Sequence, residues 1–242
     1  MELRIFKEYD TLSTTAAEIF IRASIDAIEV RGRFLVALSG GSTPTGLYRT
    51  LASEAYRNQI NWQKTFVFWG DERCVPPNDE GSNYYQADEA MLSHIPIPHE
   101  NILRVKGELI PYEAANAYAQ TLKEFAGPEL EWPRFDLVLL GMGEDGHTAS
   151  LFPGSQLEVA SPTLAVTADY QGRPAARVTL TPTVFNSARR IVFLVTGKSK
   201  AFTLSQVISG NSTPEQLPAQ RIHPTDGQVT WLVDEAAASE LN

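Results

Sequence analysis

The sequence contains almost no cysteine and no long hydrophobic run. Its 242 residues include a single cysteine, Cys74, which by itself can form neither an intrachain disulfide nor a cysteine-rich zinc site. No apolar segment approaches the ~20 residues needed to cross a bilayer. The N-terminus, MELRIFKEYD, lacks the apolar core of a secretory signal. These absences predict a cytoplasmic protein in a reducing compartment, without a membrane partner.

Histidine and positive charge are also scarce. The 4 histidines are scattered along the chain without the close spacing of metal ligands, so we expect neither a metal nor another cofactor. Lysine and arginine number 20 against 29 aspartates and glutamates, a net charge of −9 that argues against a protein built to coat nucleic acid. An anionic small-molecule substrate is still compatible with this charge, provided that its site is locally positive.

The remaining composition is that of a globular protein, with 43% apolar and 20% charged residues. The length fits one domain, and no linker divides residues 1–242 convincingly. The stretch richest in turn-forming residues, 209–224, comes too late to separate two domains and is interpreted as an excursion within one. No pattern in the sequence specifies an oligomer, and we expect a monomer.

Four nearly continuous apolar segments have the length of strands: Arg33–Leu38, Thr65–Trp69, Phe135–Leu140 and Ile191–Val195. Continuous apolar character is typical of strands that are covered on both faces of a parallel sheet. Helix-like stretches alternate with these segments: Thr11–Val30, Thr45–Ala52, Asn83–Ser93 (with Ser82 as its N-cap), Pro111–Phe125 and Ser199–Ile208. The alternation predicts an α/β layered fold with a mainly parallel central sheet flanked by helices.

Glycine and polar residues follow every one of the four apolar segments. The sequences are SGGSTP after Leu38, GDER after Trp69, GMGEDGH after Leu140 and TGKSK after Val195. In an open parallel sheet, ligands bind beyond the carboxyl ends of the strands. We therefore expect the four loops to form one composite pocket.

The segment Ser39–Pro44 predicts a phosphate site at the start of a helix. Gly40 and Gly41 let the backbone approach a ligand closely, and Ser42 and Thr43 supply hydroxyl groups. The free amides of a first helical turn and the positive end of the helix dipole favour a phosphate group there. The Gly-Lys-Ser/Thr ending of a P-loop is missing, so nucleotide binding is not expected. The alternative is an ordinary glycine-rich turn with a Ser/Thr cap.

His147 lies in a glycine-dense loop directly after a buried segment. A histidine that faces a pocket suits general-base chemistry, although a single histidine can also be a surface or structural residue. Asp145, or another loop carboxylate such as Asp71, is the candidate to orient its imidazole, and the pattern leaves this choice open. The other histidines, which lie among prolines or at helix ends, are interpreted as surface or structural residues: His94, His99 and His223.

Three cations are candidates to neutralise a bound anion: Arg73 in GDER, Arg177 at the head of a short strand-like segment, and Lys200. Arginine binds a phosphate or carboxylate with two parallel hydrogen bonds. A lysine at a helix N-terminus opposes the helix dipole, which favours an anionic ligand nearby, solvent exposure being the alternative. For GDER the alternative is an ion pair that fixes the loop, and Cys74 beside it is interpreted as incidental.

Taken together, five stretches resemble the 6-phosphogluconolactonase family: LSGGSTPTGLY (38–48), FWGDERCVPPNDEGSNY (68–84), FDLVLLGMGEDGHTASLFPG (135–154), RVTLT (177–181) and VTGKSKA (195–201). They follow the order of the family and spread over most of the chain. The resemblance implies a Rossmann-like fold related to sugar-phosphate isomerases and amino-sugar-phosphate deaminases. It also implies metal-free hydrolysis of 6-phosphogluconolactone to 6-phosphogluconate, the second step of the oxidative pentose phosphate pathway.

In the mechanism that we expect, the phosphate binds at Gly41–Thr43 with Arg177 and Lys200, and Arg73 lies close to the substrate. His147 then takes a proton from the water that attacks C1. Loop amides near Gly143, or a cation such as Arg73, are the candidates to stabilise the oxyanion.

Two other functions are alternatives to lactone hydrolysis. The related deaminases share the glycine loop and the DGH segment, but carry a glutamate five residues after the histidine, where this chain has Phe152. Phenylalanine cannot supply that carboxylate, which disfavours a deaminase or isomerase. A non-catalytic sugar-phosphate sensor usually carries a DNA-binding helix-turn-helix segment, for which the sequence shows neither spare length nor a basic N-terminal region.

Overall fold

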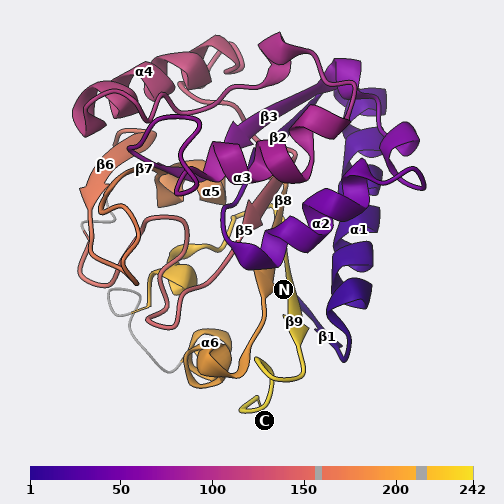
Figure 1. The fold of residues 1–242 in the computed structure, drawn as a ribbon, viewed down its shortest axis with the longest axis vertical. Helices are drawn as coiled ribbons and strands as arrows, with labels where there is room; N and C mark the ends of the chain where they lie inside the picture. Colours follow the sequence, from indigo (N-terminus) through magenta and orange to yellow (C-terminus); the bar gives the residue numbers. More distant parts are fainter. Residues whose placement is uncertain (156–159, 211–216, 242) are drawn as a thin grey trace.

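A six-stranded sheet forms the centre of the protein (Figure 1). The structure, a computed structural model, describes residues 1–155, 160–210 and 217–241. The strand order is β1-β9-β8-β5-β2-β3, and every neighbouring pair is parallel. The strands are β1 Glu2–Phe6, β2 Phe34–Leu38, β3 Thr65–Trp69, β5 Leu137–Leu140, β8 Arg190–Val195 and β9 Gln228–Asp234. The predicted α/β fold with a mainly parallel central sheet is confirmed.

Helices cover both faces of this sheet. On one face lie α1 Tyr9–Arg31, α2 Ser42–Ala52 and α3 Asn83–Ala90; on the other lie α4 Pro111–Glu124, α5 Pro182–Asn186 and α6 Ala201–Ser209. Successive residues of a strand point to opposite faces, so Val36 packs on the α1 side and Leu35 on the α4 side. Burial on both faces explains why the central strands are apolar at every position. Short 3-10 helices occupy Arg57–Gln59, Trp62–Lys64, Leu92–His94, His99–Asn101, Lys198–Lys200 and Pro218–Arg221.

A second, three-stranded antiparallel sheet lies beside the carboxyl end of β3. Its order is β4-β7-β6, from β4 Asp71–Arg73, β7 Ala176–Leu180 and β6 Thr163–Thr167. The chain passes from β3 through Gly70 directly into β4. The sequence predicted only the strand-like character of the Arg177 segment. Strands β4 and β6 were not predicted; β4 is short and wholly polar, so it lacks the apolar pattern from which a strand is recognised.

Several element boundaries differ from the predicted ones. Helix α2 begins at Ser42 rather than Thr45, because Gly41, with φ +102°, is the N-cap. Helix α3 ends at Ala90, and Ser82 caps its start as predicted by accepting the Tyr85 N–H. The edge strand β1 and its neighbour β9 were not predicted. Of the excursion 209–224, residues 211–216 lie outside the described part of the chain.

The strand order places a topological switch point between β2 and β5. From β2 the chain continues outward to β3, then returns to the other side of β2 for β5. The loops that follow β2 and β5 therefore leave in opposite directions and open a crevice, the usual place for a ligand in such sheets. Within the described residues, every helix is too short or too polar to span a bilayer.

Candidate active site

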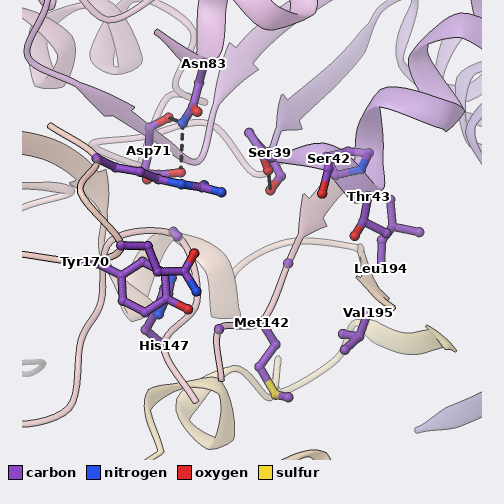
Figure 2. A pocket seen from close by; sticks show the side chains of 18 of the residues that line it. Ser39, Ser42, Thr43, Asp71, Asn83, Met142, His147, Tyr170, Leu194 and Val195 are labelled. Atoms are coloured by element: carbon purple, nitrogen blue, oxygen red, sulfur yellow. Dashed lines mark hydrogen bonds between the residues drawn. The ribbon is translucent and has the colours of Figure 1, made fainter. Parts of the chain in front are cut away.

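A cavity of about 180 Å³ opens at the switch point (Figure 2). The loops after β2, β5 and β8 line it from the large sheet, and β4 and β7 line it from the small one. Nine of the predicted site residues contribute to its wall: Gly40, Gly41, Ser42, Thr43, Asp71, Arg73, His147, Arg177 and Lys200. The remaining one, Asp145, is not part of the wall and contacts His147, which is. The structure therefore brings the four predicted loops together.

The glycine loop after β2 is held close to its neighbours. A side chain at Gly40 would overlap the amide of Asn83, so only glycine fits there. The Thr43 hydroxyl lies 2.9 Å from the Thr196 hydroxyl, which joins the start of α2 to the loop after β8. The first amides of α2 have no partner within the helix and lie at the cavity wall beside Ser42. This geometry suits an anion.

His147 and Asp145 form a pair at the opposite wall. The Nδ1 of His147 lies 2.6 Å from Oδ1 of Asp145, and the His147 backbone N–H donates to the same oxygen at 3.2 Å. Burial raises the pKa of Asp145, but the hydrogen bonds and charge of His147 outweigh it, so the net shift is downward. Among the described residues, Nε2 of His147 has no hydrogen-bond partner. The arrangement fixes the imidazole through one nitrogen and leaves the other available.

Asp71, the alternative partner for the imidazole, is engaged elsewhere. Its Oδ2 accepts a hydrogen bond from the Ser150 hydroxyl at 2.6 Å. The Asn83 amide donates to the Asp71 carbonyl at 2.8 Å and to its Oδ1 at 3.3 Å. The geometry thus pairs Asp145, and not Asp71, with His147. Asp71 still lines the cavity, with its carboxylate buried beside the loop of His147.

Glu72 has a structural role that was not predicted from the sequence. Its buried carboxylate accepts hydrogen bonds from the backbone N–H groups of Arg73, Asn83 and Tyr84 at 2.6–2.7 Å, and from the Ser82 hydroxyl at 3.1 Å. Burial raises the pKa of Glu72 to about 7, against the opposing effect of these hydrogen bonds. Glu72 anchors the N-terminus of α3.

The alternative of an ion pair within GDER does not occur among the described contacts, where Arg73 donates to the carbonyl of Gly81 at 2.7 Å.

Two buried arginines lie side by side on neighbouring strands of the small sheet. Arg73 in β4 is the direct register partner of Arg177 in β7, and they are only 5% and 2% exposed. Nε of Arg73, and both Nε and Nη2 of Arg177, are buried without a hydrogen-bond partner. Burial lowers the pKa of Arg177; Asp71 opposes this effect and Arg73 adds to it. Like charges directly opposite each other are unfavourable, and buried guanidinium nitrogens without a partner add to the cost, so this wall favours an anion.

Lys200 and Arg173 complete the positive wall. Lys200 is half-buried, and burial lowers its pKa, partly offset by Glu144 and Asp145. Arg173 was not predicted; it lies in the turn between β6 and β7, where Gln171 and Gly172 have positive φ, and it lines the same cavity. The Gln-Gly pair between two strand-like segments was the available signal for this turn. Among the described residues, no group of three or more His, Cys, Asp or Glu side chains is arranged to hold a metal ion.

The fold and the cavity define a class of protein: an α/β protein with a positively charged small-molecule site and a carboxylate-paired histidine at the switch point of its sheet. Residues 7–231 match the model of the family described as glucosamine-6-phosphate isomerases/6-phosphogluconolactonase, and the chain belongs to this family. The resemblance predicted from the sequence is confirmed.

Proteins from several organisms are similar to this chain over most of their length. The 6-phosphogluconolactonase of Haemophilus influenzae is 40% identical over 206 residues, which cover 85% of this chain and 87% of that protein. A probable 6-phosphogluconolactonase 2 of Oryza sativa subsp. indica is 35% identical over 253 residues, covering 100% and 90% of the two chains. The solved structure of 6-phosphogluconolactonase from Trypanosoma brucei superposes with a TM-score of 0.87 at 28% identity, covering 100% of this chain and 98% of that one.

Proposed function

We propose that this protein hydrolyses 6-phospho-D-glucono-1,5-lactone to 6-phospho-D-gluconate, with His147 as the general base that activates water. Lactone hydrolysis is the activity by which its relatives in several organisms are named. The single observation that carries the detailed proposal is the cavity itself, in which the imidazole of His147 shares the wall with two buried arginines whose guanidinium groups keep nitrogens without a hydrogen-bond partner.

Binding precedes chemistry in this proposal. The phosphate group binds at the first turn of α2, where Gly41–Thr43 offer amides and hydroxyls, and Arg177 and Lys200 neutralise its charge. Arg73 and Arg173 lie at the same wall and extend the positive field over the sugar. Anchoring the remote phosphate places the lactone carbonyl near His147, so binding energy contributes to orientation at the reacting centre.

In the chemical step, Nε2 of His147 takes a proton from water as the water oxygen bonds to C1 of the lactone. Asp145, hydrogen-bonded to Nδ1, stabilises the imidazolium that forms. The tetrahedral intermediate collapses with cleavage of the bond between C1 and the ring oxygen, and the imidazolium returns the proton to that oxygen. The product is the open-chain acid, and no cofactor enters the balance.

For the oxyanion, the contacts favour Arg73 over the loop amide. The Gly143 N–H already donates to the His147 carbonyl at 2.8 Å. Arg73 lines the cavity, and its guanidinium, held in place by the hydrogen bond to the Gly81 carbonyl, carries the positive charge that an oxyanion in the tetrahedral intermediate requires. Arg73 is therefore the proposed stabiliser of the developing charge.

The position of Phe152 supports hydrolysis over deamination or isomerisation. Its ring stacks on the imidazole of His147, with centroids 4.5 Å apart and an interplanar angle of 29°. A deaminase would have a glutamate at this position to assist the histidine in ring opening. Here an apolar ring occupies the place, and among the described contacts the carboxylate bound to His147 is that of Asp145.

The test is hydrolysis of the phosphorylated lactone, followed by proton release with a pH indicator against the spontaneous rate. We expect a large enzymatic rate without added metal, from a monomer of one domain. A rate equal to the spontaneous one would contradict the proposal and favour a non-catalytic sugar-phosphate sensor. Release of ammonia from an amino-sugar phosphate, measured in parallel, would indicate the deaminase alternative.

A further inference from the structure

Four residues enclose the imidazole of His147. Asp145 binds Nδ1, Phe152 stacks on one face, and Gly143 lies so close that any side chain on it would overlap the ring. The fourth is Tyr170, whose ring meets the imidazole edge to face, at 4.5 Å between centroids and 78° between planes (Figure 2). The ring is therefore restrained on every side except toward the cavity.

Tyr170 differs from the other three in its origin. Asp145, Phe152 and Gly143 belong to the same loop as His147, so they move with it. Tyr170 comes from the turn between β6 and β7, in the small antiparallel sheet that also carries Arg73 and Arg177. It is thus the contact that ties the imidazole to the sheet holding the buried arginines.

We propose that Tyr170 is a positioning residue. Its ring packs against the imidazole of His147 and fixes the orientation of that imidazole relative to the arginines of the cavity wall. The inference rests on the proposed role of His147 as general base. A hydrogen bond at Nδ1 alone lets the imidazole swing about that contact, whereas packed rings on two sides restrict it to one orientation. General-base catalysis depends on this restriction, because misplacement of a reacting group by 1 Å can lower the rate by roughly 10²-fold.

The ring, and not the hydroxyl, provides this function. The hydroxyl oxygen of Tyr170 accepts only a long hydrogen bond, 3.4 Å from the Glu144 N–H. The turn itself closes through backbone bonds, from Arg173 N–H to the Tyr170 carbonyl at 3.1 Å and from Ala168 N–H to the Ala175 carbonyl at 3.0 Å. Because these bonds involve the backbone alone, we expect the protein to stay folded when the side chain is replaced.

The experiment compares Tyr170→Ala and Tyr170→Phe with wild-type enzyme in the lactone assay, with thermal unfolding of each protein as the folding control. Tyr112→Ala removes an exposed tyrosine from α4 and serves as the matched control. We expect Tyr170→Ala to lower kcat by about 10-fold to 10²-fold with KM unchanged, since orientation is lost while the anion site remains. Tyr170→Phe, which keeps the ring, is expected to retain wild-type kcat.

Three outcomes would overturn the inference. Wild-type kcat in Tyr170→Ala would show that the loop of His147 orients the imidazole by itself. A raised KM with unchanged kcat would make Tyr170 a substrate-binding residue. Equal losses in the Phe and Ala variants would assign the function to the hydroxyl. Failure of the proposed function is distinguishable from all three, because the wild-type protein would then show only the spontaneous rate.

Discussion

His147 lies against Gly143 so closely that position 143 admits no side chain. On another side the same imidazole stacks on Phe152, and the guanidinium of Arg177 lies 5.3 Å from the centre of that phenylalanine ring. One apolar ring therefore contacts both the proposed base and a proposed anion-binding group. Small and apolar neighbours set the positions of the charged groups that act on the substrate.

The first prediction concerns Gly143→Ala. The added methyl group would overlap Nδ1 and Cε1 of His147 and crowd Asp145, so the imidazole must shift. We expect kcat to fall by about 10²-fold, the size of effect that small misplacements produce. Gly127→Ala is the control, because its methyl group would lie in ordinary contact, 3.9 Å from Leu130. Equal activity of the two variants in the lactone assay would contradict the prediction.

Removal of the imidazole itself is the second prediction. His147→Ala is expected to lower kcat by roughly 10²–10⁴-fold, the usual contribution of a general base, with little change in KM because the anion-binding wall is intact. The exposed His99, replaced by alanine, is the control. Both constants follow from initial rates of proton release. Unchanged kcat in His147→Ala would remove His147 from the proposed role.

Buried carboxylates of strand β4 hold the start of helix α3. Glu72 leaves β4 and accepts the first amides of α3, so the strand that carries Arg73 and the helix that carries Asn83 share one anchor. Asn83 in turn holds Asp71 and restricts Gly40. The geometry of the cavity thus depends on the hydrogen bonds of a residue that does not line it.

This anchor predicts a pH dependence of stability. Burial raises the pKa of Glu72 to about 7, above its ordinary value of 4.5. Between these values the folded protein holds a proton that the unfolded chain has lost, so the contribution of Glu72 to stability is present below pH 4.5 and decreases as the pH rises through 7.

Urea unfolding of wild type and Glu72→Gln at several pH values within this window checks the prediction. Glutamine cannot titrate, and we expect the difference in unfolding free energy between the two proteins to change with pH in the stated direction. The exposed Glu54, replaced by glutamine, should parallel wild type. A pH-independent difference between wild type and Glu72→Gln would show that Glu72 stays ionised throughout.

The whole molecule carries a net charge of −9, yet four of its cations line one cavity. Concentrating Arg73, Arg173, Arg177 and Lys200 on one wall creates a local field opposite in sign to that of the molecule. The free protein has unfavourable electrostatic interactions at this wall, and a bound anion relieves them. Ligand binding and global stability are therefore linked.

Inorganic phosphate and the proposed product, 6-phosphogluconate, should both raise the thermal unfolding midpoint of the protein. Arg177→Gln should lose most of this increase and raise KM by about 10-fold to 10²-fold, the equivalent of one charge-assisted hydrogen bond. Without ligand, the variant should be no less stable than wild type, because a like-charged pair is removed. The exposed Arg22→Gln variant is the control. An undiminished phosphate effect in Arg177→Gln would place the anion elsewhere.

Four strands of the large sheet and the loop of His147 were predictable because their signals are local. Strand β3 was predicted at its observed bounds, Thr65–Trp69, since its four residues after Thr65 form a continuous apolar run, the pattern of a strand covered on both faces. His147 and Asp145 lie two residues apart, so their loop carried both in one motif. Strand β4 was missed for the opposite reason, since all three of its residues are polar and only a folded cavity explains why they are buried.

The sequence by itself determined that strands ending in glycine and polar residues would gather their loops at one edge of a parallel sheet, because periodicity and turn chemistry act over a few neighbouring residues. Only the tertiary structure decided that Arg73 lies opposite Arg177, that Tyr170 packs on His147, and that Asp71 binds Ser150. These contacts depend on strand register and on the packing of segments far apart in the chain, and no local pattern encodes either.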